Sequence, residues 1–282
     1  MRRPSCHRIS LLSFEFASIV QDVKGSGEPL VLIHGAFADA RIWAPNLDEL
    51  SQRFQVITVS LPGAFRSQDS GDHSAEEHVA AIADLIDSMP EGAHVLGHSR
   101  GGRIAFHLAA MRPQGVRGLV LVEPGGAMEP SFSELIDGSP ASGGEWAKSA
   151  RDGALNLLEA GEFEAAAKHY IDSMQGAGQW DQAPRLFRDV AIDNIATLKW
   201  IAKDSSTAFS IDAAKRIIVP TLILVGTESP PIFKQIGGVL FKLIPSSVRE
   251  RIDGGGHLLP LTHASEFAQR VSRFLYQQPS NQ

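Results

Sequence analysis

The sequence lacks several features that would indicate a compartment or a partner. It contains one cysteine, Cys6, among 282 residues, and a single thiol cannot form a disulfide within the chain, so nothing requires an oxidising compartment. Runs of lysine and arginine are absent and the net charge is −6, which argues against nucleic acid as a partner. No apolar run is long enough to cross a membrane. We therefore expect a soluble, cytoplasmic protein.

The N-terminus carries a partial likeness to a signal peptide. Arg2 and Arg3 precede the apolar residues 9–12, but Glu15 and Asp22 interrupt the region that follows. No small residues stand at a cleavage position after an unbroken apolar stretch. We expect an ordinary first strand with a short tail.

Apolar residues are abundant and grouped. They make up 43% of the chain, which is enough for a large core. The strongest apolar runs are continuous rather than alternating, as is typical of parallel strands buried on both faces. Helical patterns separate them, such as the one that follows a capping box at residues 74–77 and the one at residues 267–275. This alternation predicts an α/β fold with a doubly wound, mostly parallel sheet flanked by helices. The expected strands are residues 29–33, 54–59, 93–96, 118–122 and 221–225, with a weaker pattern at 248–252.

One long stretch, residues 128–215, has no strong strand pattern. It lies between two expected strands and is too long for a plain loop. We expect a helical lid over the C-terminal edge of the sheet, where open α/β folds bind ligands. Residues 1–127 and 216–282 would then form the core domain.

Within the expected lid, helical patterns occur at residues 154–170 and 186–201. Three of the four tryptophans lie in this stretch. Their side chains can either line a ligand pocket or fill the lid's own small core, and the pattern favours neither. The three are Trp146, Trp180 and Trp200.

The sequence from Gly97 to Gly101 reads Gly-His-Ser-Arg-Gly and stands between an expected strand and a helical pattern. In that position the pattern predicts a nucleophile elbow, a tight turn that exposes the Ser99 hydroxyl above the sheet. The glycines are needed because side chains at their positions would collide with the neighbouring strand and helix. Ser99 is the candidate nucleophile, and it needs a base to take its proton.

His257 is the candidate base. It follows the last expected strand in a glycine-rich segment and precedes the C-terminal helix, so it can reach over the sheet edge towards Ser99. His263 is its rival at that end of the chain. We expect His263 in the first turn of the helix, directed towards solvent.

Four motifs together carry a family resemblance: His-Gly-Ala-Phe at residues 34–37, Leu-Pro-Gly at 61–63, the elbow at Ser99, and Gly-Gly-His at 255–257. The chain resembles the α/β-hydrolase superfamily over nearly all of its length outside the expected lid. The resemblance implies an α/β-hydrolase fold with a nucleophile, an acid and a histidine in that order along the chain.

The acid departs from the usual pattern. Most of the superfamily places an aspartate in a Gly-x-x-Asp setting after the strand that follows the lid, but here Ser229 occupies that slot and Glu228 stands one residue earlier. Glu123 ends the apolar run 118–122, and some lactonase-like members take their acid from that strand. A buried carboxylate is costly without a partner, and an imidazolium would be one. We favour Glu123, with Glu228 as the alternative.

By resemblance, the oxyanion hole consists of the backbone N–H groups of Ala36 and Arg100. The Arg100 side chain could attract an anionic substrate or form a surface salt bridge, and we favour the surface position. Ser60 and residues 63–67 also depart from the family's pattern. We expect that loop either to shape the pocket entrance or to support the elbow, and so to affect specificity rather than chemistry.

The resemblance implies a hydrolase that cleaves a small, apolar carboxylic ester or lactone through an acyl-serine intermediate. We expect no metal or organic cofactor, because neither a ligand cluster nor a phosphate-binding loop appears. The same residues could also serve a C–C bond hydrolase, a hydroxynitrile lyase or a cofactor-free perhydrolase. Another alternative is a member of the fold that binds a ligand without turning it over.

Overall fold

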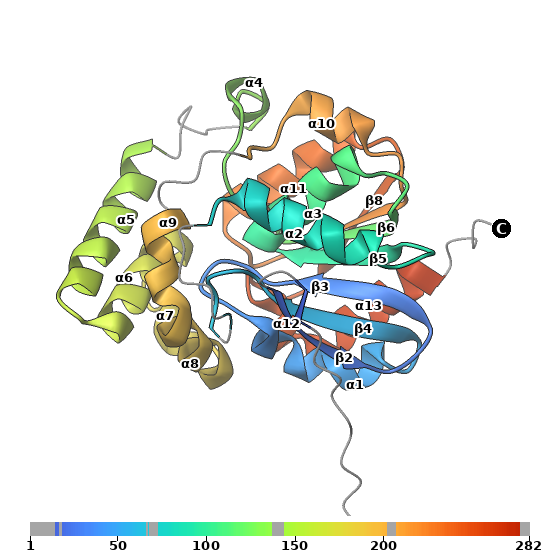
Figure 1. Ribbon diagram of the computed structural model, residues 1–282. Helices are drawn as coiled ribbons and strands as arrows, with labels where there is room; N and C mark the ends of the chain where they lie inside the picture. The colour runs from blue at the N-terminus through green and yellow to red at the C-terminus, as the bar shows by residue number, and fades with distance from the viewer. Residues whose placement is uncertain are drawn as a thin grey trace, which may run out of the picture.

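The computed structural model describes residues 15–16, 19–65, 67, 73–136, 144–201 and 207–276. The strands are β1 (Glu15–Phe16), β2 (Ile19–Lys24), β3 (Glu28–Ile33), β4 (Phe54–Ser60), β5 (Ala93–His98), β6 (Val116–Val122), β7 (Thr221–Gly226) and β8 (Ser247–Ile252). They form an 8-stranded sheet in the order β1-β2-β4-β3-β5-β6-β7-β8 (Figure 1). β2 is antiparallel to both of its neighbours, and β3 to β8 are parallel. The expected mostly parallel sheet is therefore confirmed, whereas the expected first strand near residues 9–12 lies outside the described residues.

Helices cover both faces of the sheet. In β3, Val31 and Ile33 point to one face and Leu30 and Leu32 to the other, and all four are fully buried. This explains why the apolar runs are continuous, since each face of the sheet needs apolar partners. One face packs against α2 (Ala75–Asp87), α3 (Arg100–Met111), α10 (Ile211–Arg216) and α11 (Pro231–Leu243). The other packs against η1 (Ala40–Asn46), α1 (Leu47–Leu50), α12 (Leu259–Thr262) and α13 (Ala264–Tyr276).

Two local patterns in the sequence form as expected. Ser74 Oγ accepts a hydrogen bond from the Glu77 N–H at 3.1 Å, and Glu77 Oε2 accepts one from the Ser74 N–H at 2.7 Å. This capping box starts α2. The apolar residues of α13 are buried against the sheet, as their helical spacing predicts: Phe267, Val271, Phe274 and Leu275.

The insertion between β6 and β7 is helical. It contains α4 (Pro130–Ser133), α5 (Gly144–Glu159), α6 (Phe163–Gln175), α7 (Gln179–Gln182), α8 (Arg185–Asn194), η2 (Ile195–Thr197) and α9 (Leu198–Ile201). α5 to α9 stand to one side of the sheet (Figure 1) and share a hydrophobic cluster that Phe37, from the loop after β3, joins. Phe132 and Phe209, by contrast, pack in the cluster of α3 and α11. The helical pattern expected over residues 154–170 is broken at Gly161, whose φ is 78°.

The tryptophans of the insertion differ in their surroundings. Trp180 is buried in the cluster shared by α5 to α9. Trp200 packs against Gly63, where an added Cβ would lie 2.7 Å from its ring. The Trp146 side chain lies outside the described residues. Trp180 thus fills the core of the insertion, and Trp200 covers the loop that follows β4.

A buried polar network ties the insertion to the core. Asp39 is fully buried, and both of its oxygens accept hydrogen bonds from the Arg41 guanidinium. Asn194, at the end of α8, donates from Nδ2 to Asp39 Oδ2 at 2.8 Å and accepts from the Phe65 N–H at 2.7 Å. Burial alone would raise the pKa of Asp39, but the bonds from Arg41 and Asn194 lower it below its ordinary value. The loops after β3 and β4 are therefore fixed to α8.

The opposite end of η1 is fixed as well. Asn46 is fully buried, and its Nδ2 donates to the Pro260 carbonyl oxygen at 2.9 Å. Pro260 follows the last strand in the segment that also carries His257. This short helix therefore contacts the insertion through its N-cap residue, Asp39, and α12 through Asn46.

Two buried histidines, both with neutral rings, form hydrogen bonds that hold the loops after β3 and β4. His34 donates from Nδ1 to the Gly35 carbonyl oxygen at 2.8 Å and accepts the Leu61 N–H at Nε2 at 3.0 Å. His78 donates from Nε2 to the Pro62 carbonyl oxygen at 3.0 Å. Burial lowers the pKa of His34 to about 4. Burial, with the charge of Arg100, lowers the pKa of His78 to about 3.

No helix in the described part of the chain combines the length and the apolar character needed to span a membrane.

We predict that Asn194→Ala lowers the free energy of unfolding by about 1–3 kcal/mol, because it removes one hydrogen bond to the buried Asp39 carboxylate and leaves the Phe65 N–H without its partner. Asp193→Asn is the matched control. It removes only the 2.8 Å ion pair between Asp193 and Arg41, whose side chains are 38% and 31% exposed, and such pairs contribute about 0–1 kcal/mol. Urea unfolding of both variants measures the difference. Equal losses of unfolding free energy in the two variants would show that the buried network does not stabilise the fold.

We also predict that stability falls as the pH drops below about 6.5, the ordinary imidazole pKa in an unfolded chain. The lowered pKa values of His34 and His78 keep both rings neutral in the folded protein, whereas the unfolded chain takes up the protons. Each ring therefore lowers the free energy of unfolding by about 1.4 kcal/mol for every pH unit below 6.5, until the folded-state pKa of that ring is reached. Urea unfolding between pH 7.5 and 5.5 measures this slope, which His34→Asn should reduce. A slope that His34→Asn leaves unchanged would contradict the prediction.

Candidate active site

The strand β5 ends directly in a strained turn. Ser99 has φ 54° and ψ −117°, in a region that non-glycine residues seldom adopt. The turn is so tight that a Cβ at Gly97 would lie 2.2 Å from the Gly101 carbonyl oxygen, and one at Gly101 would lie 2.4 Å from that of Ile33. The glycines at these positions are thus required by the close approach of backbone. The turn places Ser99 at the C-terminal edge of the sheet, ahead of α3.

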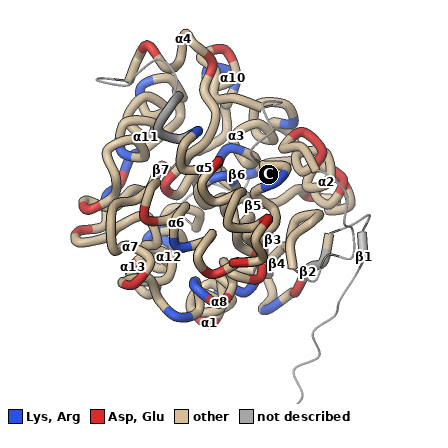
Figure 2. Tube along the Cα trace, turned by 90° about the vertical axis from the view of Figure 1, so that its left-hand side faces the viewer, with Lys and Arg blue, Asp and Glu red and all other residues tan. Residues whose placement is uncertain are grey.

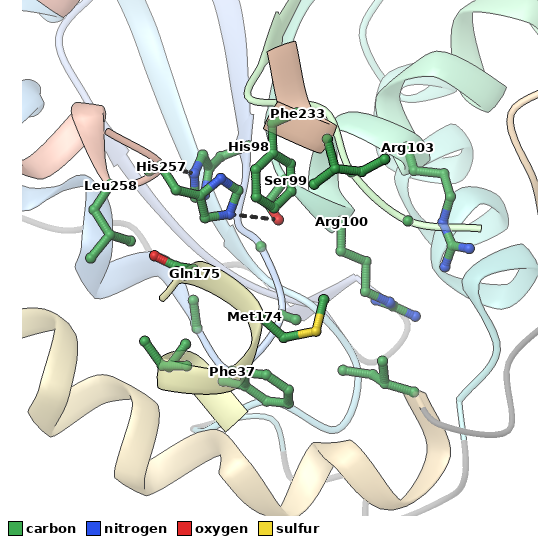
Figure 3. A pocket seen from close by; sticks show the side chains of 18 of the residues that line it. Phe37, His98, Ser99, Arg100, Arg103, Met174, Gln175, Phe233, His257 and Leu258 are labelled. Atoms are coloured by element: carbon green, nitrogen blue, oxygen red, sulfur yellow. Dashed lines mark hydrogen bonds between the residues drawn. The ribbon is translucent and has the colours of Figure 1, made fainter. Parts of the chain in front are cut away.

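The structure brings His257 to Ser99. Its Nε2 lies 3.1 Å from Ser99 Oγ (Figure 3), a distance at which the hydroxyl donates to the ring nitrogen. The imidazole is only 8% exposed. The Phe233 ring stacks on it with centroids 3.9 Å apart, and the His98 ring lies 4.9 Å away. These contacts fix the plane of the imidazole.

His98 also holds the backbone of His257. Its Nε2 donates to the His257 carbonyl oxygen at 2.8 Å. Burial lowers the pKa of His98 to about 3, so the ring stays neutral and keeps a single N–H. His98, the residue before Ser99, therefore fixes the position of the loop that carries His257.

Glu123 lies on the far side of His257 and is fully buried. Its Oε2 is 3.4 Å from His257 Nδ1, a long hydrogen bond. Its Oε1 accepts two shorter bonds of 2.6 Å each, from the Gly226 N–H and from the Ser229 hydroxyl. Glu123 has φ 48°, a left-handed conformation, as it leaves β6. The carboxylate is thus held by the end of β7 and the loop after it, with one oxygen turned to the histidine.

The alternatives weighed from the sequence lie elsewhere. Glu228 is exposed, and its backbone N–H donates to the Gly255 carbonyl oxygen at 2.9 Å. His263 follows α12, where its Nδ1 lies 2.9 Å from Thr262 Oγ1. The structure therefore brings Glu123 and His257 to Ser99 in place of these two residues.

The loop after β3 passes over Ser99. A Cβ added to Gly35 would lie 3.2 Å from Ser99 Cβ, so Gly35 lies against Ser99, and Ala36 is the next residue of this loop. Phe37, with φ 55°, turns the chain away again. The Arg100 amide belongs to the first turn of α3, where backbone N–H groups have no partner within their helix. Ala36 and Arg100 both line the cavity beside Ser99.

The expected surface position of the Arg100 side chain is wrong. Arg100 is 7% exposed, and its guanidinium donates to His78 Nδ1 at 3.0 Å. α2 packs against α3 and covers this side chain, a contact between helices that local sequence does not reveal. Arg100 instead fixes the start of α3 to α2.

A cavity of about 530 Å³ opens beside Ser99. The core contributes apolar side chains such as Phe233 and Ile236, and the insertion contributes Ile171, Met174 and Phe187. Figure 3 shows Phe37, Met174, Gln175 and Leu258 facing this space around Ser99 and His257. Neither Trp180 nor Trp200 is among the described lining residues. The cavity is therefore mainly apolar and is shared between the core and the insertion.

Charges on the insertion are mixed. Figure 2 looks onto its helices and shows basic and acidic residues interspersed along them. Ion pairs such as Lys148 with Asp152 and Lys168 with Asp181 account for several of them. Among the described residues, no group of three or more His, Cys, Asp and Glu is placed to hold a metal ion.

Sequence reasoning missed two residues that contact the site. Phe233 stacks on His257 from α11, and nothing in its local sequence marks it. Ser229 bonds Glu123, and its position in the usual aspartate slot was a signal that could have suggested this. A serine there can donate to a carboxylate that arrives from the neighbouring strand.

Comparisons with known proteins find relatives that are named as esterases. The chain is 32% identical over 173 residues to the pimeloyl-(acyl-carrier protein) methyl ester esterase of Nitrosomonas europaea, and the alignment covers 59% of this chain and 61% of that relative, less than two thirds of its length. It is 26% identical over 268 residues to the protein of the same name from Vibrio cholerae, which covers 89% of this chain and 96% of that relative.

Among solved structures, the enol-lactonase from Burkholderia xenovorans LB400 has a TM-score of 0.74 at 19% identity, with 92% of this chain and 96% of that chain covered. At this identity the likeness concerns the fold. The family model described as the alpha/beta hydrolase fold matches residues 28–264. That match spans most of the chain, and this protein therefore belongs to the alpha/beta hydrolase family.

Proposed function

We propose that this protein is a serine hydrolase that cleaves a carboxylic ester or lactone through an acyl-serine intermediate. The observation that supports this best is the hydrogen-bonded series from Ser99 through His257 to Glu123 at the wall of a cavity. Relatives named as methyl ester esterases, at 26% and 32% identity, favour ester chemistry over the other reactions of the fold.

In the first half-reaction, Ser99 Oγ attacks the carbonyl carbon while its proton passes to His257 Nε2. The carbonyl oxygen becomes negatively charged and accepts hydrogen bonds from the Ala36 and Arg100 N–H groups. When the tetrahedral intermediate collapses, the bond to the alcohol oxygen breaks and His257 returns the proton to that oxygen. The acyl group then remains on Ser99.

In the second half-reaction, His257 takes a proton from water, whose oxygen attacks the acyl carbon. Collapse of the second intermediate breaks the bond to Ser99 Oγ, which recovers its proton from His257. The products are the carboxylic acid and the free enzyme. Glu123 stays ionised throughout, accepts the Nδ1–H of His257 and stabilises the imidazolium.

The helices α5 to α9 act as the lid in this proposal. They supply one wall of the cavity, so that an apolar small molecule is enclosed when it reaches Ser99. Exclusion of water strengthens the hydrogen bonds to the developing oxyanion. The apolar lining favours esters or lactones with hydrocarbon portions.

We predict that Ser99→Ala lowers the rate of p-nitrophenyl butyrate hydrolysis by at least about 1000-fold, since Ser99 is the hydroxyl that is hydrogen-bonded to His257 Nε2. A fluorophosphonate probe should label the wild type and fail to label this variant. Labelling that survives in Ser99→Ala would overturn the assignment of the nucleophile. Turnover of cyanohydrins or C–C substrates in place of esters would overturn the reaction class while leaving the nucleophile in place.

We predict that Glu123→Gln lowers kcat by about 100-fold or more, because a neutral amide can neither stabilise the imidazolium nor hold the productive tautomer. Ser229→Ala should cause a smaller loss, because Gly226 still bonds the carboxylate. The matched control is Glu228→Gln, which changes an exposed carboxylate in the same loop and should alter kcat less than twofold by the usual effect of exposed sites. A collapse of activity in Glu228→Gln alone would show that the acid is Glu228.

A further inference from the structure

The wall of the cavity is mainly apolar, but its arginines give it a positive charge. No aspartate or glutamate is among the described lining residues, which include Arg100, Arg103 and Arg151. Arg100 donates to His78, and Arg103 donates to the Thr207 carbonyl oxygen at 2.7 Å, so both side chains already bind other parts of the protein. Arg151, by contrast, makes no hydrogen bond or ion pair within the described part of the chain.

The packing of α5 on α6 shows where Arg151 lies. The two helices stand side by side (Figure 1), and the short turn between them makes them antiparallel. Gly153 on α5 faces His169 on α6, since an added Cβ would lie 2.3 Å from the His169 Nε2. Two residues earlier on α5 and two later on α6, Arg151 therefore reaches the level of Ile171 and its neighbour Tyr170. Both of these also line the cavity.

The groups near Arg151 do not neutralise its charge. Burial raises the pKa of Tyr170, although the Arg151 charge opposes the rise, so the phenol stays uncharged at neutral pH. The acids that follow Arg151 on α5 and Ile171 on α6 are engaged in ion pairs of their own, Lys148 with Asp152 and Lys168 with Asp172. Arg151 is half-buried, and an uncompensated cation in the wall of a cavity attracts an anionic ligand.

We propose that Arg151 binds a carboxylate of the substrate, so that the protein prefers esters in which an apolar chain carries an anionic group. This inference rests on the proposed esterase function and specifies its substrate class. A guanidinium offers N–H groups with the spacing of the two carboxylate oxygens, and its single charge balances that of one carboxylate. The apolar part of the lining suits the hydrocarbon that joins the carboxylate to the ester.

The test compares esters that differ in one end group. In the first series, methyl monoesters of dicarboxylic acids from glutaric to suberic acid carry the carboxylate on the acyl portion. In the second, butyrate esters of hydroxy acids from 4-hydroxybutanoic to 8-hydroxyoctanoic acid carry it on the alcohol portion. Each anionic ester has a neutral partner in which an isopropyl group replaces the carboxylate. The two series allow a carboxylate to reach Arg151 from either portion of the ester.

The measured quantity is the ratio of kcat/KM for an anionic ester to kcat/KM for its neutral partner. We expect this ratio to be at least about ten for the preferred ester of the wild type, because hydrogen bonds to charged groups are the strong ones. Arg151→Gln should lower the ratio by at least about fivefold. Arg151→Lys should give an intermediate ratio, because it keeps the charge and loses the paired N–H groups.

Arg188→Gln is the matched control. Arg188 is also a half-buried arginine of the insertion, on α8, and it makes no hydrogen bond or ion pair with the described residues. It is not among the described residues that line the cavity. This substitution removes the same formal charge from the protein, so it measures any general effect of net charge on anionic substrates. It should leave the ratio at the wild-type value.

Three results would overturn the role of Arg151: no anionic ester of either series preferred over its neutral partner, a preference that Arg151→Gln leaves unchanged, or equal losses of preference in Arg151→Gln and Arg188→Gln. Each of them leaves the esterase function standing, because esters are still hydrolysed. Failure of the wild type to hydrolyse any of these esters or p-nitrophenyl butyrate would instead reject the proposed function itself.

Discussion

The arrangement of the site depends on one buried carboxylate that two neighbouring strand ends share. Glu123 follows β6, but the donors that hold it are Gly226, the last residue of β7, and Ser229 in the loop after β7. An ionised group without exposure to solvent is costly unless it is paired and hydrogen-bonded. The loop after β7 and His257 from the loop after β8 meet this requirement together. The segments that follow β6, β7 and β8 are thereby held in fixed positions at the same edge of the sheet.

Much of the fold follows from local sequence. The continuous apolar runs predict parallel strands because each strand must be covered on both faces, as the opposite orientations of Leu32 and Ile33 illustrate. The elbow at Ser99 can also be predicted from the sequence, since its glycines stand where neighbouring backbone leaves no space for a Cβ atom. Such features are encoded by residues close together in the chain, and a single sequence is enough to find them.

Other features depend on contacts between distant segments. Arg100 is buried because α2 covers it, and Phe233 meets His257 because α11 runs past the last loop. Tyr170 and Gln175 belong to an amphipathic helix whose pattern indicates one buried face but not which neighbour that face meets. Side chains of this kind are indistinguishable from ordinary core residues until the tertiary arrangement is known.

The two ends of η1 have a mechanical consequence. Asp39 is hydrogen-bonded to α8, and Asn46 is hydrogen-bonded to the segment after His257. Ala36 precedes Asp39 by a few residues in the chain. Any outward movement of α8 would pull on the backbone that carries one of the proposed oxyanion donors, the Ala36 N–H. The position of α8 is therefore coupled, through Asp39, to the geometry of the proposed active site.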